Sequence, residues 1–412
     1  MKHIFNTVAV LLAALLAAGC DNAEYGEGGK IGDSLGVHAF FAEGIKTPGI
    51  SSSNILLSQD EGAKATLTPS LTDKLNEDCV MKLVMDQDIL ARYNAEQGTS
   101  FEMLPDSLVN LGGDITIPAG QYAAEAVIIE LGMMPEDLIG LPFAVPVKIE
   151  KVSGDFELAA NTSGYVIEVS SVLENDLAQF NGAAALWVEN FEQTFDQFTI
   201  EMRLQVSNTN NRNRDIFSCI EDGELMFRFE DPQSASATDP GHSLVQFQGV
   251  GGYLNPKEGM HIEVNKWQHY AVTYDGTKVT IYVNGVDAGS KEFAPSVVKN
   301  GYFKYLTFMG IGGYNGSWGP GDSWWYGCKT MVTECRIWSV ARTADQIAKN
   351  MASVTPTTKG LEGYWRVNKA TYDESKSQFE DLTGKGHPMT AKKGVSVWNE
   401  GIQSIDEATP WK

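Results

Sequence analysis

Positive charge is scarce in this chain of 412 residues, which has 31 lysines and arginines against 53 aspartates and glutamates and a net charge of −22. A nucleic-acid binder needs a basic face that releases counterions from phosphates, so this balance excludes nucleic acid as a partner. Histidine is also scarce, at six residues, and none stands in an H-E-x-x-H or comparable spacing. The sequence therefore does not favour a catalytic zinc site.

The chain is nevertheless apolar enough to fold, with 43% hydrophobic residues. Its 41 glycines, 9 tryptophans, 14 tyrosines and 18 phenylalanines indicate many turns and broad aromatic surfaces rather than a helical bundle. We therefore expect an all-β protein of two or three domains.

The apolar run from Val8 to Ala18 follows Lys2 and is too short to cross roughly 30 Å of hydrocarbon, but its length suits a signal peptide. It ends in small residues before Cys20, and this end resembles that of a bacterial lipoprotein signal. The resemblance implies a signal peptide at residues 1–19, acylation of Cys20, and anchoring at the outer membrane with exposure at the cell surface. Residues 20–36 are polar and glycine-rich, which predicts a flexible tether. An ordinary secretory signal with a chance cysteine is the alternative.

Four cysteines remain in the exported chain, and their spacing matches neither a disulfide framework nor a C-x-x-C motif: Cys79, Cys219, Cys328 and Cys335. Buried thiols and disulfides both stay open for them.

Residues 37–175 contain short apolar segments between turn signals, a pattern that predicts an antiparallel, immunoglobulin-like β-sandwich. The segments are 54–58, 64–68, 80–85, 114–117, 125–131, 144–149 and 164–169. Landmarks here resemble the N-terminal domain of unknown function of Bacteroidetes surface lipoproteins, which implies an architecture and no reaction. They are Asp86, Tyr93-Asn94, Leu104-Pro105, Ile117 to Gly120 and Leu141-Pro142.

Residues 176–412 contain a clear hairpin pattern, because Val272 and Tyr274 share one strand face and Val279 to Val283 alternate along the returning strand. Asp275-Gly276 supplies the turn between them. The run from Trp267 to Gly285 resembles the concanavalin A-like (laminin-G-like) jelly-roll superfamily. Supporting landmarks are Phe198 to Arg203, Glu334 to Trp338, Ala341 to Thr343, Leu361 to Trp365 and Phe379 to Thr383.

One short helix is expected after Thr343, because Thr343 and Gln346 match a capping box and Ile347 and Met351 share a face.

Catalytic motifs are weak. The G-x-S-x-G pattern at Gly32 to Gly36 lacks the buried strand and following helix of a nucleophile elbow, so we interpret it as chance. Jelly-roll glycosidases need two carboxylates side by side, and no E-x-D-x-x-E pattern occurs. Glu201 and Glu334 are lone strand carboxylates that we interpret as structural.

Calcium is open at family level, since some laminin-G-like and pentraxin-like domains hold an ion at a loop rim. The segment from Ser207 to Asp215 and the pair Glu230-Asp231 offer oxygens, without the dense carboxylate spacing of a dedicated Ca²⁺ loop.

The most distinctive segment runs from Gly312 to Gly327 and combines aromatic residues with glycines. Aromatic rings stack on the C–H faces of sugars, while amides and carboxylates bind hydroxyls. The candidate glycan-binding residues are therefore Tyr314, Asn315, Trp318, Asp322, Trp324 and Trp325. Strand alternation would instead turn either Trp325 or its neighbour Tyr326 into the core.

These features together predict a lipid-anchored, non-catalytic protein that captures polysaccharide or glycoprotein glycan beside outer-membrane importers or glycosidases. An adhesion or scaffold protein that binds protein partners is the alternative, and a hydrolase with an unrecognised site is a weaker one.

Overall fold

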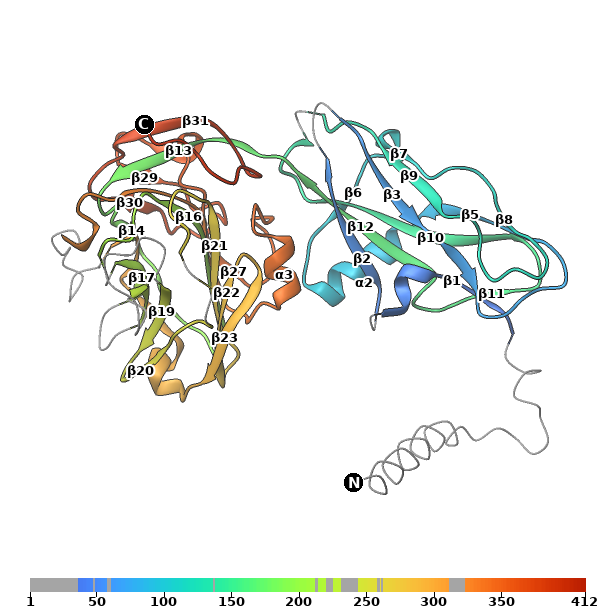
Figure 1. The fold of residues 1–412 in the computed structure, drawn as a ribbon, viewed down its shortest axis with the longest axis horizontal. Coiled ribbons are helices and arrows are strands. Elements are labelled where there is room, and N and C mark those ends of the chain that lie inside the picture. Colours follow the sequence, from blue (N-terminus) through green and yellow to red (C-terminus); the bar gives the residue numbers. More distant parts are fainter. Residues whose placement is uncertain are drawn as a thin grey trace, which may run out of the picture.

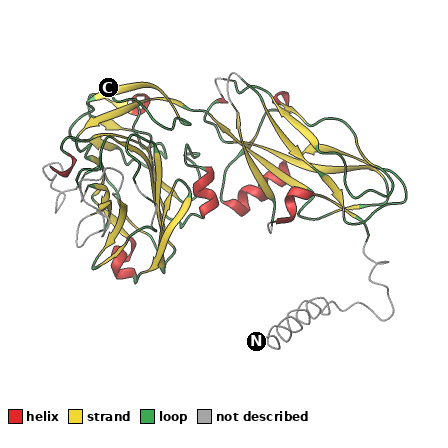
Figure 2. Ribbon diagram, in the orientation of Figure 1, coloured by secondary structure: helices red, strands yellow, loops and turns green. Residues whose placement is uncertain are grey.

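The computed structural model describes residues 36–46, 49–57, 61–135, 138–211, 214–219, 225–230, 244–257, 260, 262–310 and 323–412. Two β-sandwiches lie side by side along the long axis of the molecule (Figure 1). Strands dominate both, and the few helices are short (Figure 2). The predicted all-β class is confirmed. Among the described residues, no helix is long and apolar enough to span a membrane.

The predicted signal peptide, Cys20 and most of the tether lie outside the described residues, as do residues 32–35 of the G-x-S-x-G pattern.

The N-terminal sandwich contains a sheet in the order β2-β12-β10-β5-β8, with β6 beside β10, and two smaller sheets in the orders β11-β1-β4 and β3-β9-β7. Its strands are β1 (His38–Phe41), β2 (Ser51–Leu57), β3 (Ala63–Leu67), β4 (Pro69–Leu71), β5 (Cys79–Met85), β6 (Glu102–Met103), β7 (Val109–Asn110), β8 (Ile115–Ile117), β9 (Val127–Leu131), β10 (Phe143–Ser153), β11 (Glu157–Leu158) and β12 (Gly164–Ser171). Two 3₁₀ turns, η1 (Ala42–Lys46) and η2 (Asp106–Leu108), complete it.

The predicted antiparallel pairing is wrong for part of this sandwich, because β12 runs parallel to β2 and β10 runs parallel to β6. More than a hundred residues separate β2 from β12. A connection of that length allows the crossover that parallel strands require, and short apolar segments carry no signal for it.

The helix α2 (Gln87–Gln97) covers the outer face of the main sheet, and sequence reasoning did not predict it. Alternate residues of β10 divide between two cores, with Val145 and Val147 inside the sandwich and Ala144 beneath the helix. Asp86 caps the helix by accepting hydrogen bonds from the Asp88 and Ile89 amides. This landmark of the N-terminal domain is thus a folding residue.

The C-terminal sandwich packs two large sheets, in the orders β23-β22-β21-β16-β26-β13-β31, with β27 beside β26, and β20-β19-β18-β17-β25-β14-β30-β29-β28. A small pair joins β15 (Glu192–Thr194) and β24 (Tyr302–Lys304). The first sheet contains β13 (Glu174–Asn181), β16 (Phe198–Val206), β21 (Gln268–Tyr274), β22 (Lys278–Val283), β23 (Val286–Glu292), β26 (Lys329–Trp338), β27 (Leu361–Trp365) and β31 (Val397–Gln403).

The second sheet contains β14 (Leu186–Val188), β17 (Asp215–Cys219), β18 (Met226–Glu230), β19 (Leu244–Gly249), β20 (Gly252–Leu254), β25 (Leu306–Phe308), β28 (Tyr372–Asp373), β29 (Gln378–Phe379) and β30 (Met389–Ala391). The helix α3 (Ala344–Lys349) and the 3₁₀ turns η4 (Pro295–Gly301), η6 (Ser323–Trp325) and η7 (Lys369–Thr371) lie in the connections.

The predicted hairpin is confirmed, with Tyr274 opposite Val279 and Asp275 Oδ1 accepting hydrogen bonds from the Thr277 and Lys278 amides. The capping box at Thr343 and Gln346 is present as well. Cys79, Cys219, Cys328 and Cys335 are buried free thiols, which resolves the open alternative.

The chain passes from the first domain to the second through two residues, Val172 and Leu173, which lie between β12 and β13. The predicted boundary at residue 175 therefore falls inside β13, a strand that pairs with β26 and β31 of the C-terminal sandwich. Independent folding of the two halves stays a prediction.

Candidate functional site

Two of the six predicted glycan contacts lie within the described residues. Trp324 and Trp325 form the turn η6, whereas Tyr314, Asn315, Trp318 and Asp322 lie outside them.

Trp325 is fully buried and packs on Phe229 at a ring-centroid distance of 5.5 Å, with the Arg214 guanidinium 5.4 Å from its ring. This residue belongs to the core of the sandwich, which corrects its place among the candidate ligand contacts. Its direction follows from the 3₁₀ turn, in which successive side chains do not alternate as they do in a strand.

Trp324 and Tyr326 flank this buried ring and point outward. Their side chains are 43% and 88% exposed. Two large aromatic residues are thus exposed within three positions of the chain. Tyr326 was not among the predicted contacts. Strand alternation allowed either Trp325 or Tyr326 to face the core, and the candidate set contained Trp325, which is the buried one.

The turn is held from beneath by Arg214, whose Nε donates to the Trp324 carbonyl oxygen at 2.8 Å. The same guanidinium donates to the backbone and side-chain oxygens of Asn208 at 2.6 and 2.8 Å. Asn208 and Asn211 in turn donate to the carbonyl oxygens of Gly327 and Trp324 at 2.9 and 3.0 Å. The exposed rings therefore stand on a fixed backbone rather than on a loose loop.

These contacts bring the segment that begins at Ser207 beside the aromatic segment, although more than a hundred residues separate them. The backbone and side-chain oxygens of Asn208 accept from the Arg214 cation, so neither is a free calcium ligand in this structure. Among the described residues, no group of three acidic, histidine or cysteine side chains could hold a metal ion. Asp231 lies outside the described residues, so the calcium hypothesis stays untested there.

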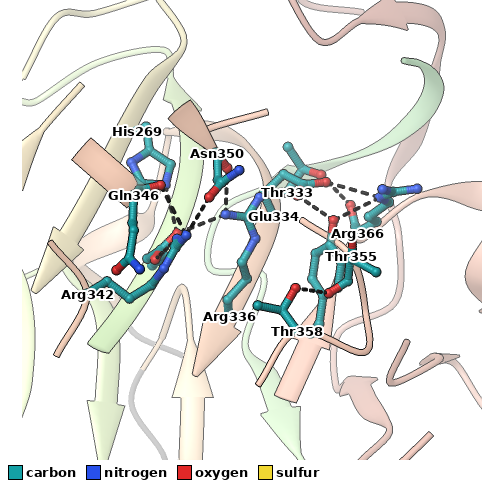
Figure 3. Close-up of polar contacts among 12 residues, drawn as sticks. His269, Thr333, Glu334, Arg336, Arg342, Gln346, Asn350, Thr355, Thr358 and Arg366 are labelled. Carbon is teal, nitrogen blue, oxygen red and sulfur yellow. Dashed lines mark hydrogen bonds and ion pairs between the residues drawn. The ribbon is translucent and has the colours of Figure 1, made fainter. Parts of the chain in front are cut away.

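The two strand carboxylates lie on the outer face of the first sheet, in a buried network of charges (Figure 3). Glu201 binds Arg342 at 2.7 Å and Arg336 at 2.8 Å. Glu334 binds Arg336, accepts a hydrogen bond from the Tyr364 hydroxyl at 2.6 Å, and contacts Arg366 at 3.2 Å.

The electrostatics of this network suit a structural role. Burial alone would raise the pKa of Glu201, but the charges of Arg342 and Arg336 and a contact with His269 outweigh it and hold that pKa well below its ordinary value. Burial together with the charge of Glu334 raises the pKa of Tyr364 to about 12. Glu201 is thus an inaccessible carboxylate that is ionised at neutral pH, and it is unsuited to donate a proton to a glycosidic oxygen.

The arginines of this network were visible in the sequence only as landmarks of the jelly-roll pattern. A signal was present in β16 and β26, where Glu201, Glu334 and Arg336 place charges of opposite sign on neighbouring strands, because a buried arginine requires a carboxylate partner.

Two different family models match the two halves of the chain. Residues 180–348 match the family model of the concanavalin A-like lectin/glucanases superfamily. Residues 39–155 match the family model of an N-terminal domain. No curated protein matches the chain.

Three of the solved structures that are similar to this chain illustrate the range. A proposed carbohydrate-binding protein of Bacteroides ovatus is 20% identical over 88% of this chain and 99% of its own, with a TM-score of 0.43. EndoBT-3987 of Bacteroides thetaiotamicron is 23% identical over 29% of this chain and 28% of its own, with a TM-score of 0.26. A SAP-like pentraxin of Limulus polyphemus is 18% identical over 43% of this chain and 80% of its own, with a TM-score of 0.31.

Proposed function

Starting from a C-terminal domain of the concanavalin A-like lectin/glucanases superfamily, we propose that this protein binds glycan at the aromatic turn without cleaving it. The observation that carries the proposal is the pair of exposed rings, Trp324 and Tyr326, on a turn fixed by Arg214. Flat rings on a rigid backbone suit the C–H faces of sugars, because little side-chain freedom is lost on binding. Tyr314, Asn315, Trp318 and Asp322 stay glycan-binding candidates on sequence grounds.

The non-catalytic part of the proposal is supported by the placement of the two strand carboxylates. Glu201 and Glu334 are 0% and 3% exposed and each is held by arginine. A glycosidase needs two carboxyl groups that face the scissile bond from an open cleft.

The place of action in this proposal is the outer membrane, with the protein held by acyl chains on Cys20 and exposed at the cell surface. Permanent anchoring suits a protein that concentrates polysaccharide or glycoprotein glycan near importers or glycosidases. The tether at residues 20–36 would separate the folded domains from the bilayer.

The test uses the soluble chain from residue 21 onward and a screen of immobilised host and dietary glycans. Trp324→Ala and Tyr326→Ala are each expected to weaken binding about fivefold, since one stacked ring contributes about 1 kcal/mol. Trp318→Ala combined with Trp324→Ala is expected to weaken binding roughly ten- to hundredfold. Tyr122→Ala is the matched control, because Tyr122 is a 51% exposed ring in the other domain.

Unchanged glycan affinity in the combined variant would remove the aromatic turn as the binding site. Capture of a protein partner that depends on Trp324 would favour the adhesion alternative. Release of reducing sugar from a bound glycan would refute the non-catalytic role.

A further inference from the structure

A cavity of about 420 Å³ lies between the two domains. The residues that line it do not include those of the aromatic turn. One side is formed by the end of α2 and by β2 and β12, and the other by α3 and the chain that follows it. In Figure 1, α3 lies on the side of the C-terminal domain that faces the N-terminal domain. Cavities of this size at domain junctions are common places for small ligands.

The domains contact each other on both sides of the cavity. On one side Gln346 donates to the Gln97 carbonyl oxygen at 2.7 Å, and Lys349 reaches Ser52 at 2.8 Å and Glu168 at 3.0 Å. On the other side the Leu173 amide donates to Ser404 Oγ at 3.0 Å, and the Ser404 amide donates back to the Leu173 carbonyl oxygen at 2.7 Å. These contacts hold the two domains together at the cavity.

Three of the five charged side chains of the wall have charged partners in the protein, whereas Glu96 accepts from the Ile50 amide and Lys359 is exposed. Glu168 is buried and accepts from Tyr93, Ser52 and Lys349. Lys349 also contacts Asp345 at 3.0 Å, and Arg342 belongs to the Glu201 network. A charged ligand would have to compete with these pairs, whereas an uncharged ligand leaves them intact.

The wall is otherwise rich in uncharged hydrogen-bonding groups. Hydroxyl and amide side chains come from both domains, among them Asn54, Ser100, Ser170, Asn350, Ser353 and Thr355. Ser100 Oγ and the indole Nε1 of Trp338 are buried with no hydrogen-bond partner among the described residues. Both atoms are shielded from solvent, so a ligand in the cavity would reach them only after a small shift of the neighbouring side chains, and such a shift would remove the cost of leaving them unpaired.

Apolar side chains from both domains complete the wall: Leu56, Leu141, Val340 and Ile405. These four are between 38% and 52% exposed, which is unusual for large aliphatic residues that lie together. The cavity therefore offers aliphatic surface beside neutral hydrogen-bonding groups. Sugars combine these properties, since they present C–H patches and many hydroxyls without charge.

We propose that this interdomain cavity is a second ligand site, distinct from the aromatic turn, and that it binds an uncharged saccharide of two or three sugar units. Binding there contacts both domains at once, because each supplies one wall.

The experiment uses the soluble chain from residue 21 onward and saturation-transfer NMR with a panel of uncharged trisaccharides of glucose, mannose, galactose, xylose and arabinose. Ser353→Trp introduces an indole into the cavity from a half-buried position. Ser290→Trp is its matched control, because Ser290 is exposed on β23 away from the cavity. Ser100→Ala removes the unpartnered hydroxyl and is expected to preserve or raise the melting temperature while it weakens binding about threefold to tenfold.

The expected result is a trisaccharide whose signal persists in Trp324→Ala and Ser290→Trp, is lost in Ser353→Trp and weakens in Ser100→Ala. Persistence in Trp324→Ala separates this site from the aromatic turn, so either site can fail without the other. The proposal is overturned if no trisaccharide of the panel binds, if every signal disappears with Trp324, or if Ser100→Ala and Ser353→Trp, both folded by their melting curves, bind as the wild type does. Binding of trigalacturonate in preference to every uncharged sugar would also overturn it.

Discussion

Replacing Glu201 by glutamine keeps the shape of the side chain but removes its charge from the buried network. Arg342 then loses its carboxylate partner and keeps the uncharged Gln346 carbonyl oxygen at 3.0 Å, Asn350 Oδ1 at 2.6 Å and the Trp338 ring at 4.2 Å. Arg336 retains Glu334. Because Arg342 and Glu201 are almost completely buried, water cannot replace the missing charge.

Breaking a buried ion pair by removing one partner destabilises a protein by about 3–5 kcal/mol. For a domain of this size, 1 kcal/mol corresponds to a change in melting temperature of about 2–4 °C. We therefore expect Glu201→Gln to lower the melting temperature of the C-terminal domain by about 6–20 °C, measured by calorimetry. Glu192→Gln is the matched control, because Glu192 pairs with Lys304 and Tyr302 at the surface, and only a small change is expected there.

The loss of stability in Glu201→Gln should depend on pH. The folded-state pKa of Glu201 lies below its ordinary value of 4.5. Its contribution to stability is therefore fully present above pH 4.5 and is lost as the pH falls through the lower, folded-state pKa. The difference in unfolding free energy between wild type and Glu201→Gln should be constant from pH 7 to about pH 5 and decrease in stronger acid. A variant that melts like Glu192→Gln, or a difference that disappears at neutral pH, would refute the reasoning.

Three further predictions concern the anchor, the aromatic turn and the domain boundary. Cys20→Ala should abolish labelling by a radioactive fatty acid in cells, and retained label would contradict the lipoprotein interpretation. Trp325→Ala should lower the unfolding free energy by about 3–5 kcal/mol because it empties a core position, whereas Trp324→Ala should change it little. Denaturant titrations measure both, and equal losses would contradict the assignment of one ring to the core and one to the surface. A chain of residues 172–412 should fold alone with a cooperative transition in circular dichroism, whereas residues 178–412 should be less stable because they lack the first half of β13; an unstructured 172–412 chain would disprove independent folding.

Local signals predicted local structure well in this chain. The hairpin at Asp275-Gly276 and the helix cap at Thr343 depend on residues that are adjacent in the sequence, and both are present. The helix α2 was missed because only three of its residues, Ile89, Leu90 and Tyr93, are buried. Three apolar positions are too few to show a clear helical period in the sequence.

The parts of the site that sequence could not supply depend on distant contacts. The inward turn of Trp325 requires Arg214 and Phe229, and Arg214 precedes it by more than a hundred residues. The cavity between the domains depends on how two separately patterned halves meet, and no periodicity within either half reports that geometry. The aromatic segment itself was identifiable, because its composition alone was unusual.

If the protein holds polysaccharide and is anchored at its N-terminal end, as proposed above, the two-residue connection between β12 and β13 has a mechanical consequence. Tension on a captured chain would enter at the C-terminal sandwich and leave through Leu173 toward the membrane, so it would pull β13 lengthwise. Antiparallel hydrogen bonds lie across the strand direction, and β13 is bonded on both sides, to β26 and to β31. A lengthwise pull must break these bonds together rather than one after another, which makes the domain most resistant to force in the direction in which its cargo would load it.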